Sequence, residues 1–387
     1  MATRFAGIAS PAAVEHLRWS LVDGVGPILF ARIIEHFGSV RVALEAGVQT
    51  LQAVEGIGPV IAEQMARSRD AADVEAELAR AEKHGVRILC REDEEYPRLA
   101  KEMPDPPIVL YVRGRIEPRD DLAVAIVGAR RCTLYGREQA HRFGYQLAQR
   151  GATVVSGLAR GVDGESHKGA LAAGGRALAV LGNGLSSIYP PEHKELAARI
   201  AENGALLSEL PMTTSPAREN FLPRNRLIAG LARGVVVVEA AQRSGALSTA
   251  ARAAEYNREV YAVPGRVDSE FSAGTNALIR DQHAKLITGV DDILDELGEM
   301  GAALRDPEQT AAGEPPPARL MLNEDERAVH ESLDHEERSV EMIAEATGRS
   351  ASKVASTLIT LQLKGLVRQL PGARFVRAVR RSGEPGT

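Results

Sequence analysis

The sequence is poor in cysteine and contains no long apolar run. The two cysteines among 387 residues, Cys90 and Cys132, give no disulfide framework and no metal-ligand spacing, which is typical of a reducing compartment. The N-terminus has no apolar stretch behind a basic cluster, so we expect no signal peptide. No stretch approaches the length of a membrane span. These absences predict a cytoplasmic protein without a membrane segment or a metal site.

An excess of positive charge is absent as well. The formal net charge is −5, from 47 Lys and Arg residues against 52 Asp and Glu residues. A surface that binds nucleic acid must therefore be a local patch. The length allows two or three domains.

Two common nucleotide-binding motifs are missing. A dinucleotide site requires G-x-G-x-x-G after the first strand and an acidic residue at the end of the second, and a P-loop requires G-x-x-x-x-G-K-[ST]. After the first predicted strand, Gly128 stands alone before Arg130 and Arg131, and the second strand ends in Ser156 and Gly157. We therefore expect neither an NAD enzyme nor a P-loop nucleotidase.

The middle of the chain, from about Asp121 to Gly298, alternates apolar strands with helical patterns. The strands are "AVAIVGA", "ATVVSG", "RALAVLG", "ALLSEL", "GVVVVEA" and "EVYAVPG". Short, continuously apolar strands between helices indicate a parallel sheet that is buried on both faces. We predict an α/β, Rossmann-like doubly wound domain over residues 86–298, with ligands at the carboxyl ends of its strands.

The flanking segments predict two small domains. Within residues 1–85, "VDGVGPILFARIIEHFG" and "VEGIGPVIAEQMA" repeat one start and resemble the helix-hairpin-helix motif of DNA repair proteins. After a linker at residues 299–319, residues 320–387 contain three helical patterns and a hairpin that turns at Pro371 and Gly372, which predicts a winged helix. For each domain the sequence leaves two roles open, DNA binding or a scaffold and protein contact.

Several loops of the middle segment are rich in hydrogen-bond donors and cations that suit phosphate groups. These donors and cations are Ser156, Gly157, Arg160, Lys168, Ser244 and Gly245. We expect Asp163 to cap its helix and His167 to pack locally, because no third ligand accompanies them. No loop carries a convincing nucleophile–base pair. The surface is therefore predicted to hold several phosphates and to have no catalytic residue.

The stretch "ENFLPRNRLIAGLARG" combines an aromatic ring with cations. Phe221 precedes Pro223 at the expected start of a helix, and Arg224, Asn225 and Arg226 follow. A ring beside arginines suits a ligand that is both planar and anionic.

Five ordered motifs resemble the DNA-processing protein A family (DprA, also called Smf). They are "VGARR", "SGLARGVDGESHKGAL", "NFLPRNRLIAGL", "SGALSTA" and "AVPG…GTNALI", and the bridge "YP…PPIVLYVRG" ahead of them is also similar. The resemblance implies a protein without a cofactor that binds and protects single-stranded DNA and helps to load the RecA recombinase during natural transformation. It also implies a homodimer formed through the Rossmann-like domain.

The same resemblance assigns roles to individual residues. Arg130, Lys168, Arg224 and Arg226 would bind phosphates, and Phe221 would stack on a base. Four cations predict a logarithmic salt slope of about −3 for each DNA-bound subunit. The full predicted DNA-binding set is Gly128, Arg130, Ser156, Gly157, Arg160, Lys168, Phe221, Arg224, Asn225, Arg226, Ser244 and Gly245.

An enzyme of the Rossmann-like phosphoribohydrolase type is the alternative. In such an enzyme Glu239, at the end of the fifth strand, would lie over a ribose. Product formation that disappears in Glu239→Gln would favour it.

Overall fold

The computed structural model describes residues 4–298, 301, 304, 324–333, 338–363, 366–370 and 374–377. Its internal contacts divide the chain into two units, Met1–Thr310 and Ala311–Thr387, which are described separately. The predicted linker at 299–319, except residues 301 and 304, and the predicted hairpin turn at Pro371 and Gly372 lie outside the described residues.

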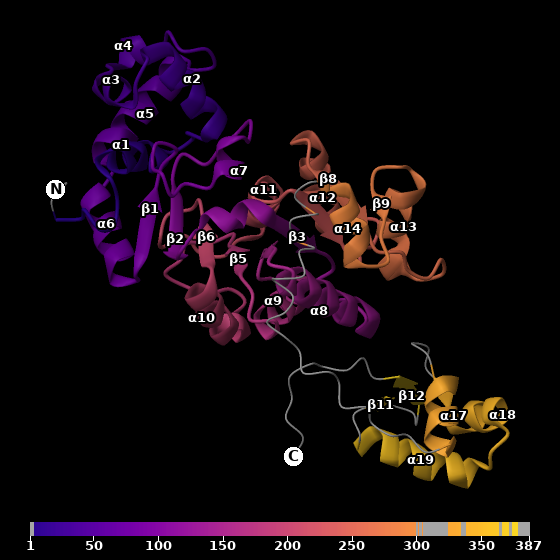
Figure 1. The fold of residues 1–387 in the computed structure, drawn as a ribbon. Helices are drawn as coiled ribbons and strands as arrows, with labels where there is room; N and C mark the ends of the chain where they lie inside the picture. The colour runs from indigo at the N-terminus through magenta and orange to yellow at the C-terminus, as the bar shows by residue number, and fades with distance from the viewer. Residues whose placement is uncertain are drawn as a thin grey trace. The chain divides into compact units, whose positions relative to one another are not determined.

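A nine-stranded mixed sheet runs through the first unit (Figure 1). Its order is β1-β2-β6-β5-β4-β3-β7-β8-β9, with antiparallel pairs β1–β2 and β2–β6 and parallel pairs elsewhere. After β3 the chain adds strands first on one side and then on the other, so the sheet is doubly wound as predicted. The strands are β1 (Val86–Leu89), β2 (Leu110–Gly114), β3 (Ala123–Val127), β4 (Thr153–Ser156), β5 (Ala177–Val180), β6 (Ala205–Ser208), β7 (Gly234–Val237), β8 (Glu259–Ala262) and β9 (Lys285–Leu286).

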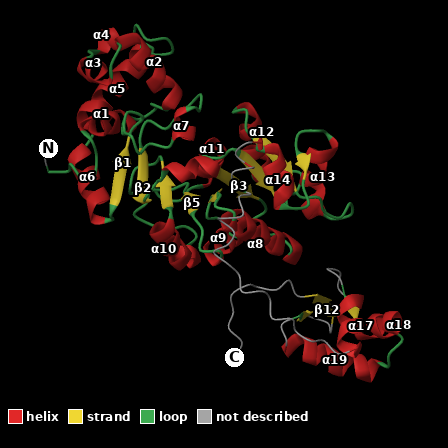
Figure 2. Ribbon diagram, in the orientation of Figure 1, coloured by secondary structure: helices red, strands yellow, loops and turns green. Residues whose placement is uncertain are grey.

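The two faces of the sheet bury separate hydrophobic cores, because alternate residues of a strand point to opposite faces. Val124 and Ile126 of β3 pack in the core that contains Phe143, whereas Ala125 and Val127 pack in the other. Helices cover both faces (Figure 2). The first core includes residues of α8 (Leu134–Gln149), α9 (Val162–Ala172), α10 (Lys194–Asn203) and α14 (Val290–Glu296). The second includes residues of α7 (Arg98–Lys101), α11 (Arg218–Gly230) and α12 (Ala246–Glu255), and α13 (Ala273–Arg280) follows β8.

The N-terminal helices share the first of these cores with the sheet. In both copies of the repeat, the first glycine (Gly24, Gly56) has a positive φ, +80° and +88°, and the second glycine caps a helix that begins with Pro27 or Pro59. Positive φ favours glycine, which explains the first glycine of each copy. The helices are α1 (Pro11–Ser20), α2 (Pro27–Phe37), α3 (Val40–Glu45), α4 (Val48–Leu51), α5 (Pro59–Ala71) and α6 (Val74–Lys83).

Helix α11 begins earlier than the sequence suggested. Proline favours the first turn of a helix, so Pro223 was expected at the start. The helix instead begins at Arg218 and carries Pro223 inside it. Phe221 therefore lies within the first turns of the helix.

The second unit has the predicted winged-helix architecture. Its small sheet has the order β10-β12-β11 and its described hydrophobic core includes Val329, Ile343, Leu358 and Phe375. The elements are α17 (Glu324–Ser332), β10 (Arg338–Ser339), α18 (Val340–Thr347), α19 (Ala351–Leu363), β11 (Val367–Leu370) and β12 (Arg374–Arg377).

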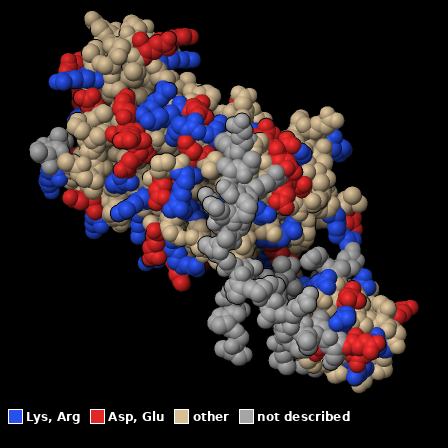
Figure 3. Space-filling view, viewed as in Figure 1, with Lys and Arg blue, Asp and Glu red and all other residues tan. Residues whose placement is uncertain are grey.

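Charges of both signs are mixed on the molecular surface. Figure 3 shows Lys and Arg side chains interspersed with Asp and Glu over one face, as the net charge of −5 leads one to expect. None of the helices in the described part of the chain combines the length and the apolar character needed to cross a membrane.

Candidate nucleic-acid interface

Tight contacts fix the loop that leaves β3. A Cβ on Gly128 would lie 2.6 Å from Val162 Cγ2 and 2.9 Å from the Glu239 carbonyl oxygen, so a larger residue does not fit there. The backbone N–H and the hydroxyl of Thr133 donate to the Glu239 carboxylate at 2.8 and 2.6 Å. Glu239 is 2% exposed and anchors the start of α8, which leaves it no open position over a ribose.

Arg130, carried by this loop, lies over the ring of Phe221. Its guanidinium carbon is 4.7 Å from the ring centroid, a distance typical of a cation–π contact. The Tyr189 ring lies 5.7 Å from the Phe221 ring at an interplanar angle of 35°. Arg130 is exposed, and an aromatic pair thus adjoins an accessible cation.

A shallow hollow of about 20 Å³ joins these residues. It is too small to enclose more than about one water molecule, so a nucleotide would lie over it. Its lining residues are Arg130, Gly157, Ala159, Arg160, Tyr189, Pro190 and Phe221. The structure therefore brings together four predicted residues, Arg130, Gly157, Arg160 and Phe221.

Arg224 lies beneath this hollow and not on the surface. It is 5% exposed, and its Nη1 donates to the carbonyl oxygens of Gly157, at 2.8 Å, and Val180. Burial lowers the pKa of Arg224 to about 10, with Asp163 opposing the shift and Arg130 adding to it. The residue stays charged at neutral pH and ties α11 to the ends of β4 and β5. This corrects the expectation that its side chain is open to a phosphate.

The donors at the end of β4 are also used within the protein. The Ser156 hydroxyl donates to the Ile126 carbonyl at 2.5 Å. The backbone N–H groups of Gly157 and Ala159 donate to the Asp163 carboxylate at 3.2 and 3.3 Å. Asp163 thus secures the preceding loop and does not cap its own helix. The Gly157 N–H and the Ser156 hydroxyl, two donors of the predicted phosphate cradle, are therefore already used within the protein.

Arg226 is not among the residues that line the hollow. It is 8% exposed, pairs with Glu209, and donates to the Asp105 carbonyl at 2.5 Å. These contacts join α11 to the bridge before β2 and to the end of β6. The predicted role of Arg226 as a phosphate ligand does not fit this placement.

Asn225 connects α11 to the loop after β7. Its Nδ2 donates to the Gly245 carbonyl at 3.2 Å and to Ser248 Oγ at 3.0 Å. Ser244 accepts the Ala246 N–H at 3.3 Å, and Gly245 is exposed. This turn lies beside α11 but does not line the hollow.

Two predicted cations are exposed and paired with carboxylates. Arg160 donates to Glu192, and Lys168 Nζ lies 2.9 Å from Glu165 Oε1. Exposed ion pairs are weak, so a phosphate can replace either carboxylate. Lys168 lies on α9 outside the lining of the hollow.

His167 is enclosed on α9. It is fully buried, and neither ring nitrogen has a hydrogen-bond partner among the described residues. Burial lowers the pKa of His167 to about 3, and the charges of His193 and Arg224 act in the same direction. The imidazole packs in its neutral form, as the sequence suggested.

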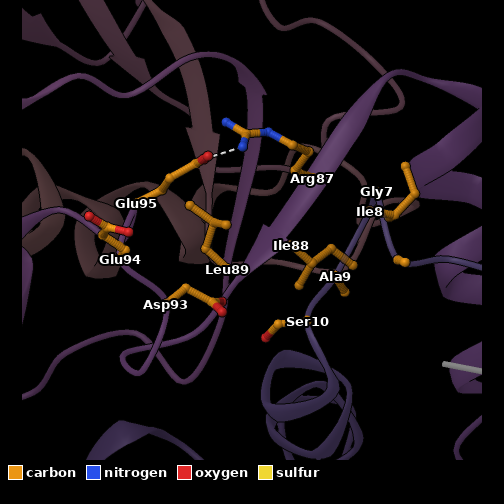
Figure 4. Close-up of a pocket in the computed structure, with 11 residues that line it drawn as sticks. Gly7, Ile8, Ala9, Ser10, Arg87, Ile88, Leu89, Asp93, Glu94 and Glu95 are labelled. Carbon is orange, nitrogen blue, oxygen red and sulfur yellow. Dashed lines mark hydrogen bonds and ion pairs between the residues drawn. The ribbon is translucent and has the colours of Figure 1, made fainter. Parts of the chain in front are cut away.

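A larger cavity, of about 290 Å³, lies at the β1 edge of the sheet. Figure 4 shows Ile8 and Ala9 beside Ile88 of β1, and Arg87 of the same strand paired to Glu95. Asp93 and further carboxylates line it, so it disfavours a nucleic acid. The candidate nucleic-acid site is therefore the smaller of these two cavities.

Sequence comparisons match both units. The family described as "DNA recombination-mediator protein A" matches residues 87–298, and the "DprA winged helix domain" matches residues 312–373. "Protein Smf" of Synechocystis sp. is 35% identical over 93% of this chain and 98% of its own length. The chain belongs to the DprA/Smf family. Another DprA/Smf relative, "Protein Smf" of Escherichia coli, is 38% identical over 79% of this chain and 80% of its own length.

A solved DprA structure agrees with the fold. DNA processing protein A (DprA) from Streptococcus pneumoniae superimposes with a TM-score of 0.64 and 32% sequence identity, covering 73% of this chain and 97% of its own. The predicted family and fold class are thereby confirmed.

Proposed function

We propose that this DprA/Smf chain binds single-stranded DNA over the loops that leave β3, β4 and β5, without catalysing a reaction on it. The observation that carries the proposal is the Arg130–Phe221–Tyr189 contact beside the exposed Arg160. Aromatic rings that stack on bases, next to cations that hold phosphates, bind single strands with little sequence preference. Bases in a duplex are already stacked, so the aromatic pair favours the single strand.

The proposed roles differ among the predicted residues. Arg130, Arg160 and Lys168 contact phosphates, and Phe221 and Tyr189 stack on bases. Arg224, Asn225 and Gly157 hold the loops and α11 in place. Arg226 joins α11 to the bridge and takes no part in DNA binding.

Fluorescence anisotropy with labelled oligonucleotides tests this proposal. We expect wild type to prefer the single strand over the duplex. Arg130→Ala and Phe221→Ala should weaken single-strand binding, the latter by about 1–3 kcal/mol, the value of one stacked base. Arg119→Ala is the matched control, because this exposed arginine precedes β3 and so lies at the amino ends of the parallel strands. Equal affinity for duplex, or equal losses in all three variants, would contradict the site.

We further propose that the chain is a cytoplasmic homodimer, paired through its Rossmann-like domain, that helps to load RecA onto the bound strand. The family description as a recombination mediator supports the loading role. RecA-dependent ATP hydrolysis on single strands covered by a single-strand-binding protein should start sooner when the chain is added. Light scattering of the chain alone should give twice the mass of one chain. An unchanged lag would contradict loading, and a monomer mass would contradict the dimer.

A further inference from the structure

A cluster of metal-ligating side chains lies where α1 meets the loop after β1. A ring nitrogen of His16, Cys90 Sγ and a carboxylate oxygen of Glu92 all lie within 4.8 Å of one another. The Nε2–Oε2 distance is 3.2 Å. His16 and Cys90 are buried, whereas the Glu92 side chain is 55% exposed and leaves the cluster a route to solvent.

The hydrogen bond on the far side of His16 orients its free nitrogen. Nδ1 lies 2.9 Å from the Ala12 carbonyl oxygen, which only accepts, so Nδ1 carries a proton. In the neutral imidazole, Nε2 then presents a lone pair toward the Glu92 carboxylate. Two lone pairs at 3.2 Å repel unless a cation lies between them, which is either a second imidazole proton or a metal ion. An Nδ1–H bonded to a backbone carbonyl is also the usual arrangement of a histidine that binds a metal through Nε2.

Cys90 supplies the third donor from the same loop as Glu92. Its thiol is fully buried, and its backbone N–H donates to Asp93 Oδ2 at 2.7 Å. Asp93 is occupied by the N–H, which leaves His16, Cys90 and Glu92 as the ligand set.

We propose that His16, Cys90 and Glu92 bind a divalent transition-metal ion of the zinc class. Nitrogen, thiolate and carboxylate are all zinc ligands, and tetrahedral bonds of about 2.0–2.3 Å place ligand atoms roughly 3.3–3.6 Å apart. The His16–Glu92 pair already has nearly this separation. The sulfur lies within 4.8 Å of the other two ligand atoms, so its distance to each needs to shorten by at most about 1.3 Å. Binding forms Zn–N, Zn–S and Zn–O bonds, releases the thiol proton to solvent, and leaves the fourth position to water. The ion would fasten α1 to the edge of the sheet.

Metal titration of the full chain tests this site. Protein stripped with EDTA and freed of the chelator is titrated with Co²⁺, and Zn²⁺ is then added in competition with a chromophoric chelator. We expect one Co²⁺ per chain with a thiolate-to-cobalt charge-transfer absorption, which Zn²⁺ abolishes. Cys90→Ser should lose this absorption. His16→Gln and Glu92→Gln should weaken Zn²⁺ binding by at least the roughly 10- to 100-fold that a change near a metal typically costs.

Two control variants show whether a loss of metal binding is specific to the three proposed ligands. Cys132→Ser changes the other cysteine, and Glu94→Gln changes an exposed carboxylate two residues from Glu92. Both should bind Zn²⁺ like wild type. Circular dichroism verifies that each variant folds. His16 and Cys90 are buried, so their variants can unfold for reasons unrelated to metal binding. Glu92 is exposed, and Glu92→Gln therefore keeps the test decisive. Absence of the thiolate absorption in folded wild type, or equal Zn²⁺ affinity in Glu92→Gln and Glu94→Gln, would overturn the proposal.

Discussion

Arg130 carries the electrostatic part of the proposed interface. With Arg224 and Arg226 enclosed, the proposed phosphate ligands are Arg130, Arg160 and Lys168. Three phosphate contacts on a single strand predict a logarithmic salt slope of about −2, in place of the −3 expected from four cations. Arg130→Ala should make the slope shallower by about 0.7. Affinities measured from low to moderate salt determine the slope. Arg119→Ala is the control, and its slope should equal that of wild type.

In the proposed complex, Glu192 competes with DNA for Arg160. The two side chains form an exposed ion pair at the rim of the hollow. Glu192→Gln removes a negative charge and releases Arg160, so we expect single-strand binding to tighten a few-fold at low salt and the gain to shrink as salt screens the charges. Anisotropy at two salt concentrations measures the change. Weaker binding in this variant would place the phosphate path elsewhere.

At the scale of the element, α9 links stability to pH through His167. The unfolded chain protonates this imidazole below its usual pKa of 6.5, whereas the folded chain does so only near 3. The unfolded state therefore binds more protons between these values, and stability falls as the pH decreases through this window, by up to about 1.4 kcal/mol per pH unit. His167→Gln should flatten this dependence. Urea unfolding from pH 4 to 7 measures it, and equal slopes in both proteins would contradict the assignment.

Six of the nine strands, β3 to β8, could be predicted because each is a continuous apolar run between helices. Strand β2 lies within the segment predicted as a bridge, and β9 contains only two exposed residues. Strand β1 could not be predicted, since Arg87 interrupts its apolar run and the strand is stabilised by pairing with β2. Helix α11 was misplaced because Pro223 marks a helix start by propensity, whereas packing extends the helix back to Arg218.

The candidate site was predicted in part for the same reason. Arg130, Gly157 and Phe221 converge because parallel strands end at one edge of the sheet. Tyr189 was missed because its loop carries no phosphate-binding motif and only the fold brings it to Phe221. The burial of Arg224 depends on carbonyl groups of distant strands. The His16 and Cys90 pairing likewise joins residues far apart in the sequence, which spacing does not reveal.

At the scale of the whole molecule, the proposed site belongs to one of the two units. Its residues all lie within Met1–Thr310, and the winged helix belongs to the other unit. A chain ending at Leu320 should therefore bind single-stranded DNA with unchanged affinity. Anisotropy on the shortened chain measures this. A large loss of affinity would assign the winged helix a direct part in DNA binding.

The central claim is that single-stranded DNA lies over the Arg130–Phe221–Tyr189 contact. Photocrosslinking with an oligonucleotide that carries 5-iodouracil tests it most directly, because the excited base reacts preferentially with an aromatic ring stacked on it. Peptide mapping by mass spectrometry should find the crosslink at Phe221 or Tyr189, with a sharp decrease in Arg130→Ala. Crosslinks confined to the N-terminal helices or to the winged helix would contradict the claim.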